Sequence, residues 1–95
     1  MGAMTKRELL SRIHRMERLV EQLPEDAEIL EVNINWIGTD MIQSCGTGDS
    51  SVEALARTLG REVTRRDLPR RRHRRISLQV GGVTVMELRE KGDRR

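Results

Sequence analysis

The sequence predicts an α+β domain in which two helices cover one face of a mainly antiparallel sheet of four to five strands. Three observations support this fold class: helix-spaced apolar residues near the start, period-two alternation near the middle, and two apolar runs around Gly81-Gly82. The predicted order is helix, strand, short strand, helix and three strands. We assign residues 5–91 to one domain, residues 1–4 to a cloning remnant and residues 92–95 to a disordered tail.

The first helix is expected from about Thr5 to Gln22. Thr5 and Glu8 form a T-x-x-E capping box, in which each side chain accepts a hydrogen bond from the other residue's backbone N–H. Pro24 ends the helix. Apolar residues recur at spacings of four and three, and this stripe packs either on the chain's own sheet or against a second copy. In a homodimer the seam would consist of Leu9, Ile13, Met16 and Val20.

A strand is expected over residues 28–37, where apolar and polar residues alternate with period two. The pattern predicts a half-buried strand, and its inward side chains would be Leu30, Val32, Ile34 and Trp36. A turn at residues 38–40 and a short return strand at residues 41–44 follow.

The second helix is expected over residues 51–59, after the Gly-rich loop C-G-T-G-D-S. Ser50 and Glu53 repeat the capping box, and Gly60 supplies the left-handed residue that ends many helices. Glycines before a helix can present backbone N–H groups to an anion. Because this loop lacks the Lys of a phosphate-binding loop and contains Asp49, we interpret it as a plain connection.

Three strands are expected in the last third of the chain, over residues 61–66, 74–80 and 83–88. The last two form a hairpin around a two-residue type I′ turn, in which Val80 pairs with Val83. In this register one face of the hairpin carries only apolar residues, which supports the assignment. These residues are Ile76, Leu78, Val80, Val83 and Val85.

The positive charge of the chain is concentrated in one segment. The net charge is +3, but residues 61–75 hold eight arginines and two acidic residues, so this segment is +6 and the remainder is −3. Local charge of this kind marks a binding patch, and arginine can donate paired hydrogen bonds to phosphate. The expected partner is therefore DNA or RNA backbone, or else an acidic protein surface, and a merely solvated segment is the third interpretation. The candidate contact residues are Arg65, Arg66, Arg70, Arg71, Arg72, His73, Arg74 and Arg75.

The lack of aromatic residues restricts how a nucleic acid can be recognised. The chain has no Phe or Tyr and one Trp, so stacking of single-stranded bases on aromatic platforms is disfavoured. Contacts to backbone and shape, with weak sequence preference, are expected instead. Neutralising Arg70, Arg71 and Arg72 should weaken binding at every sequence.

The sequence predicts no enzyme, no metal site and no cofactor. Cys45 has no spacing relation to His14 or His73 that suggests a nucleophile and its base, and no His, Asp or Glu cluster has metal-ligand spacing. A single cysteine favours a reducing, cytoplasmic setting. No run reaches the roughly 18 apolar residues of a membrane helix, so no membrane partner is expected.

Residues 52–88 resemble a pattern found in small phage and prophage proteins. The resemblance rests on V-E-A-L-A-R-T-L-G from Val52 to Gly60, a charged strand, and I-S-L-Q-V-G-G-V-T-V from Ile76 to Val85. It implies a mobile-element accessory protein, a group that includes DNA-binding regulators and inhibitors of host defence nucleases, and it identifies no functional residue. The chain departs from that pattern because its strands there lack the usual aromatic residues.

Two functions follow from these observations. The first is a small non-enzymatic nucleic-acid-binding protein that uses the Arg61–Arg75 segment on phosphates. The second is a phage-type inhibitor, for example an anti-CRISPR or anti-restriction protein, that binds an acidic or nucleic-acid-binding host protein. Its contact surface would be the same segment or a polar sheet face of Glu31, Asn33, Asn35, Ser77, Gln79 and Thr84. A structural subunit that assembles through its first helix is a third, simpler interpretation.

Overall fold

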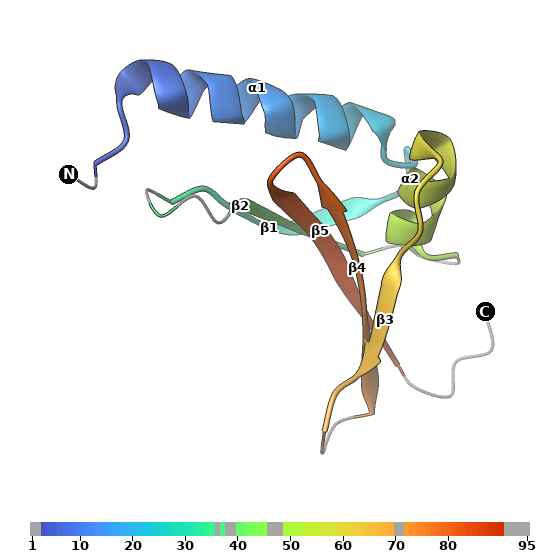
Figure 1. Cartoon of the computed structure of the whole chain (residues 1–95). Helices are drawn as coiled ribbons and strands as arrows, with labels where there is room; N and C mark the ends of the chain where they lie inside the picture. Colours follow the sequence, from blue (N-terminus) through green and yellow to red (C-terminus); the bar gives the residue numbers. More distant parts are fainter. Residues whose placement is uncertain (1–2, 36, 38–39, 46–48, 70–71, 91–95) are drawn as a thin grey trace.

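The secondary-structure elements of the computed structural model follow the predicted order, α1-β1-β2-α2-β3-β4-β5 (Figure 1). The helices are α1 (Lys6–Gln22) and α2 (Ser51–Leu59). The strands are β1 (Glu28–Asn33), β2 (Asp40–Cys45), β3 (Thr64–Asp67), β4 (His73–Val80) and β5 (Val83–Glu90). The structure describes residues 3–35, 37, 40–45, 49–69 and 72–90. The predictions for Trp36, residues 38–39, residues 46–48, Arg70, Arg71 and residues 92–95 lie outside these ranges.

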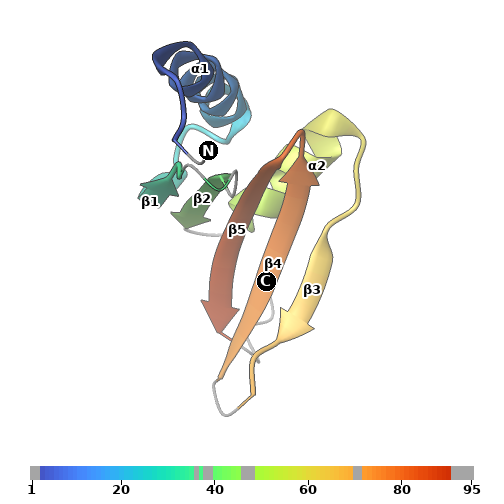
Figure 2. The ribbon, with the colours of Figure 1, turned by 60° about the vertical axis from the view of Figure 1, so that its left-hand side comes forward.

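The five strands form one mixed sheet in the order β1-β2-β5-β4-β3. Figure 2 shows β5, β4 and β3 side by side, with β2 and β1 beyond β5. Three of the four neighbouring pairs are antiparallel, as predicted, and β2 runs parallel to β5. The parallel pair is possible because α2 and the β3–β4 hairpin separate β2 from β5 in the chain, which gives the long connection that parallel strands need.

Both helices pack on the same face of the sheet and bury one apolar core. The core consists of Met16, Leu19, Leu23, Ile42, Val52, Leu55, Ala56, Ile76, Leu78, Val83 and Val85. Neither helix covers the opposite face, which we call the open face. The fold is therefore a two-layer α+β domain, in agreement with the prediction.

The local signals in the sequence are confirmed at both the first helix and the last hairpin. Glu8 N–H donates to Thr5 Oγ1 (3.1 Å) and Thr5 N–H donates to Glu8 Oε1 (2.9 Å), so the capping box is complete. The hydrogen bond from the Thr5 N–H to the carboxylate, with a smaller contribution from the Thr5 side chain, holds the pKa of Glu8 below its ordinary value. Gly81 and Gly82 have φ angles of 55° and 84°, as a type I′ turn requires, and the predicted pairing of Val80 with Val83 is present.

A buried ion pair joins α1 to the sheet. The guanidinium of Arg12 binds both carboxylate oxygens of Asp40 on β2, with Nε 2.9 Å from Oδ2, and also donates to the carbonyl of Asn35 (2.7 Å). The hydrogen bond to Asp40 raises the pKa of Arg12. Arg12 therefore serves as a structural contact beneath the helix, a role that the amphipathic pattern did not indicate.

The prediction for β1 is wrong in its length and in its burial. The strand ends at Asn33 rather than at residue 37, and all six residues are exposed instead of half-buried. The pairing with β2 shifts between Ile29 and Glu31, so Leu30 leaves the alternation and is 62% exposed. The physical reason is that β1 is the edge strand, whose helix-side residues extend beyond the cover of α1. Val32 faces the helix layer and is still 51% exposed.

A buried carboxylate from β5 occupies the N-terminus of α2. Glu87, 1% exposed, accepts hydrogen bonds from Ser50 Oγ (2.8 Å), Ser51 Oγ (3.1 Å) and the Val52 N–H (2.9 Å). Arg89 Nη1 lies 3.1 Å from its second oxygen. The carboxylate of Glu87 therefore occupies the N-terminus of α2, where an external anion would otherwise bind.

The predicted second capping box is present only in its first half. Glu53 N–H donates to Ser50 Oγ (3.1 Å), but the Glu53 carboxylate binds Arg65 of β3 instead. The strand that contains Arg65 runs from Thr64 to Asp67. It therefore starts three residues later and ends one residue later than predicted. The C-terminal prediction is confirmed, because Gly60 caps α2 with φ 68°.

The substitution Glu87→Leu should lower the free energy of unfolding by about 3 kcal/mol, because it leaves Arg89 and the donors of α2 buried without their acceptor. Urea unfolding followed by circular dichroism measures this loss. The control is Glu90→Leu, at an exposed position of the same strand, with an expected change within about 0.5 kcal/mol. Equal effects of the two substitutions would contradict a structural role for Glu87.

Candidate functional site

The Arg-rich segment forms the hairpin of β3 and β4, which projects away from α1 (Figures 1 and 2). The two strands pair antiparallel from Thr64 opposite Ser77 to Asp67 opposite Arg74. Beyond this ladder the N–H of Leu68 donates to the carbonyl of His73 (3.0 Å). Because side chains alternate along each strand, the arginines of the hairpin divide between the two faces of the sheet.

The arginines on the helix side of the hairpin are neutralised by carboxylates. Arg65, which lies opposite Ile76, donates from Nε to Glu53 of α2 (3.0 Å). Arg74 donates from Nε to Asp67 (2.8 Å), its neighbour across the ladder. Both pairs are partly exposed and each contributes at most about 1 kcal/mol. Arg65 and Arg74 therefore bring little unbalanced charge to this surface.

The arginines on the open face have no such partners. Arg66 and Arg75 lie directly opposite each other on β3 and β4, and neither forms an ion pair with a described residue. The Nε of Arg75 is buried without a hydrogen-bond partner. Like charges at opposed positions destabilise a sheet. Together Arg66 and Arg75 make an uncompensated cationic pair, which an anion would stabilise.

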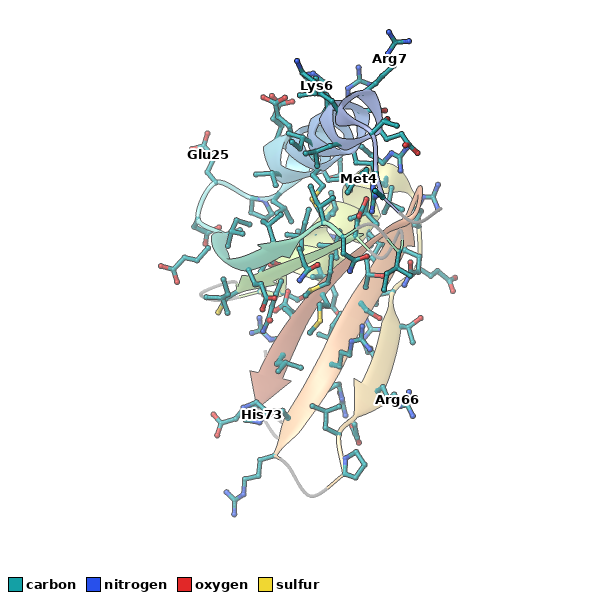
Figure 3. The ribbon with its side chains drawn as sticks, turned by 90° about the vertical axis from the view of Figure 1, so that its left-hand side faces the viewer. Met4, Lys6, Arg7, Glu25, Arg66 and His73 are labelled. Carbon is teal, nitrogen blue, oxygen red and sulfur yellow. The ribbon has the colours of Figure 1, made fainter. Side chains whose placement is uncertain are left out.

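His73 lies on the open face beyond this cationic pair, toward the end of the hairpin, and Arg72 precedes it in the chain. His73 is half-buried and lies opposite Glu90 of β5, on the same face as Arg75. Arg72 is exposed beside it. Figure 3 shows Arg66 and His73 at the end of the sheet remote from Lys6 and Arg7 of α1. Of the eight predicted contact residues, the structure places Arg66, His73 and Arg75 on the open face and Arg65 and Arg74 on the helix side. Arg72 is exposed and precedes β4, and Arg70 and Arg71 lie outside the described residues.

The remainder of the open face is less polar than the alternation predicted. Five of the six residues predicted for a polar sheet face do lie on it: Glu31, Asn33, Ser77, Gln79 and Thr84. The sixth, Asn35, lies beyond the end of β1. The centre of the open face holds half-buried apolar side chains from β2 and β5, namely Met41, Met86 and Leu88. The sequence reasoning missed this centre because it did not place β2 beside β5.

A second basic surface on α1 was also missed. Three arginines and a histidine of α1 border an open groove of about 690 Å³ beside the β4–β5 turn. Arg15 reaches across it and donates to the carbonyl of Gly81 (3.0 Å). The signal was present in the sequence, because these residues recur with helical spacing: Arg7, His14, Arg15 and Arg18.

The residues considered for catalysis lie on three different elements. Cys45 ends β2, His73 begins β4, and His14 lies on α1, where it pairs with Glu17 (3.5 Å). Within the described ranges, no three His, Cys, Asp or Glu residues are grouped so that they could hold a metal ion. None of the helices formed by these residues has the length and apolar character needed to cross a membrane.

Comparisons of the chain with protein-family models, with curated proteins and with solved structures find no match. The resemblance of residues 52–88 to small phage and prophage proteins therefore stays a prediction, and the functional interpretation rests on the geometry of the hairpin.

The substitution Arg66→Thr should raise the free energy of unfolding by about 0.5 kcal/mol at low salt, because it removes the repulsion from Arg75. The gain should shrink as added salt screens the charges. Thermal unfolding in a salt series measures it. The control Arg74→Thr has the same change in strand propensity but breaks the pair with Asp67, so its stability should fall or stay unchanged. If Arg66→Thr destabilised the protein as much as Arg74→Thr, the two arginines would not repel each other.

Proposed function

We propose that this protein is a small, non-enzymatic nucleic-acid-binding protein that contacts the sugar-phosphate backbone with the open face of its β3–β4 hairpin. The observation that carries the proposal is the opposed pair Arg66 and Arg75, two cations without a carboxylate partner among the described residues. Phosphate oxygens would supply the missing acceptors through charge-assisted hydrogen bonds. Arg72 and His73 lie next along the hairpin and widen the contact.

The architecture of the hairpin favours a double-stranded partner. Arg66 and Arg75 are held on adjacent paired strands at the β3 edge of the sheet, so the hairpin presents cations at a fixed spacing to the regularly spaced phosphates of a duplex. Contacts of this type position a protein on the backbone and read little sequence. The lack of Phe and Tyr in the chain supports the same mode, because single-strand binding depends on aromatic stacking.

A protein partner is the second candidate, and the apolar centre of the open face supports it. Met41, Met86 and Leu88 are half-buried there, with cations at the β3–β4 end and Glu28 and Glu31 at the β1 end. Interfaces between proteins commonly combine an apolar centre with a charged rim. In this alternative the chain inhibits a host defence protein, in the way that the resemblance to phage accessory proteins implies.

The triple variant Arg66→Ser, Arg72→Ser, Arg75→Ser tests the first proposal. Its affinity for short duplex DNA should fall at least tenfold at about 50 mM salt. The slope of log affinity against log salt should flatten by about 2 to 3, because each lost phosphate contact removes about 0.9 from the slope. Fluorescence anisotropy between about 50 and 200 mM salt, with duplex DNA, duplex RNA and single-stranded DNA, measures both quantities.

The matched control is the quadruple variant Glu53→Gln, Arg65→Ser, Asp67→Asn, Arg74→Ser, which removes two arginines of the same hairpin together with their carboxylate partners and leaves the net charge unchanged. It should bind within about threefold of the unmodified protein, since the net contribution of these arginines to the cationic surface is small. Absence of any binding by the unmodified protein at about 50 mM salt would overturn the nucleic-acid proposal and leave the protein partner as the better one.

A further inference from the structure

The two flanks of α1 differ in chemistry. One flank carries the exposed members of the predicted dimer seam, Leu9, Ile13 and Val20. Met16, the fourth predicted member, is instead buried in the core, and the dimer itself stays a prediction. The other flank faces the β4–β5 turn, because Arg15 on that side donates to the carbonyl of Gly81. The open groove of about 690 Å³ lies along this second flank.

The second flank carries positive charge that no carboxylate offsets. Among the described residues, none that lines the groove is Asp or Glu. His14 pairs with Glu17, but Arg7, Arg15 and Arg18 form no ion pair with a described residue. An anionic ligand would supply the acceptors that these arginines lack. The charge of the groove therefore indicates that its ligand is an anion.

The groove also offers apolar surface, which narrows the class of anion. Leu19 of α1 is buried and Val80 of β4 is half-buried, whereas Leu10 is 47% exposed. A nucleic-acid backbone is bound through polar contacts to phosphate and sugar, and it would leave Leu10 uncovered. A peptide with both carboxylates and an apolar side chain would neutralise the arginines and also cover Leu10. The composition of the groove thus favours an acidic protein segment.

Arg15 is already positioned for such a ligand. Its Nη1 donates to the carbonyl of Gly81 across the groove (3.0 Å). That acceptor is neutral, so the hydrogen bond fixes the side chain without offsetting its charge, and the other N–H groups of the guanidinium stay available. A guanidinium binds a carboxylate with paired hydrogen bonds, and a side chain that is ordered beforehand loses less entropy on binding.

The spacing of the arginines sets the length of the segment. Arg7 and Arg18 are eleven residues apart on α1, which corresponds to roughly 16 Å along the helix axis. An extended peptide rises about 3.3 Å per residue, so about five residues span this distance. Alternate side chains of an extended peptide point to the same side. A central apolar residue would therefore face the groove together with the acidic residues two positions before and after it.

We propose that the groove between α1 and the β4–β5 turn is a docking site for a short acidic segment of a partner protein. An apolar side chain of the segment packs on Leu10 and Val80, and its carboxylates bind the three arginines of the groove. This site does not depend on the proposed nucleic-acid contact, because Figure 3 shows Arg7 of α1 remote from Arg66 and His73. The chain can then hold a nucleic acid and an acidic protein segment at the same time.

A nuclear magnetic resonance titration of the ¹⁵N-labelled full chain with the blocked peptide D-E-L-D-E tests the site. At about 50 mM salt, where screening of exposed charges is weak, the peptide should shift the amide signals of Ser11, Arg15, Arg18 and Gly81, and leave those of β3 unchanged. The peptide D-E-S-D-E, which has the same charge, should bind at least about fivefold more weakly because it lacks the apolar contact.

The double variant Arg7→Ser, Arg18→Ser should bind D-E-L-D-E about tenfold more weakly, because it loses two exposed charge pairs with the peptide. The matched control is Lys6→Ser, Arg57→Ser, which removes the same charge at exposed helical positions that do not line the groove. Its affinity for the peptide should stay within about twofold of that of the unmodified protein, since distant surface charges are screened.

Several outcomes would overturn this proposal. One is the absence of shifts in the groove at about 5 mM peptide, which exceeds the dissociation constants of most weak contacts. Equal losses in the two double variants would mean that net charge alone attracts the peptide, and equal binding of the two peptides would remove the role of the apolar surface. If duplex DNA shifted the groove signals at lower concentrations than the peptide, the groove would be a nucleic-acid site. A failure of the hairpin to bind DNA is seen separately, in the signals of β3 and β4.

Discussion

The buried carboxylate of Glu87 determines where α2 sits, and α2 in turn determines which arginines of the hairpin are neutralised. An anion that is almost fully buried is stable only while its donors stay in place. The first turn of α2 supplies most of them, so α2 cannot move away from β5 without leaving that charge unpaired. With its N-terminus held there, α2 brings Glu53 to Arg65.

The period-two geometry of the strands then completes the division of charge. Fixing Arg65 on the helix side forces Arg66 onto the open face, where the antiparallel register places Arg75 opposite it. The helix side of the hairpin gains two ion pairs, and the open face carries a repulsion that lowers stability. A folded protein retains such a local cost where function requires it, which is why the proposed binding surface is assigned from the open face rather than from the arginine content.

Local rules explain which parts of this fold could be predicted from the sequence. The capping box at Thr5, the stop at Gly60 and the register around Gly81-Gly82 involve residues a few positions apart, and each prediction is confirmed. The errors concern long-range contacts. Glu87 carries no local mark of its bond to α2, and alternation alone cannot reveal that β1 is an uncovered edge. Counting arginines likewise could not show that, among the arginines of β3 and β4, those on the helix side have carboxylate partners and those on the open face do not.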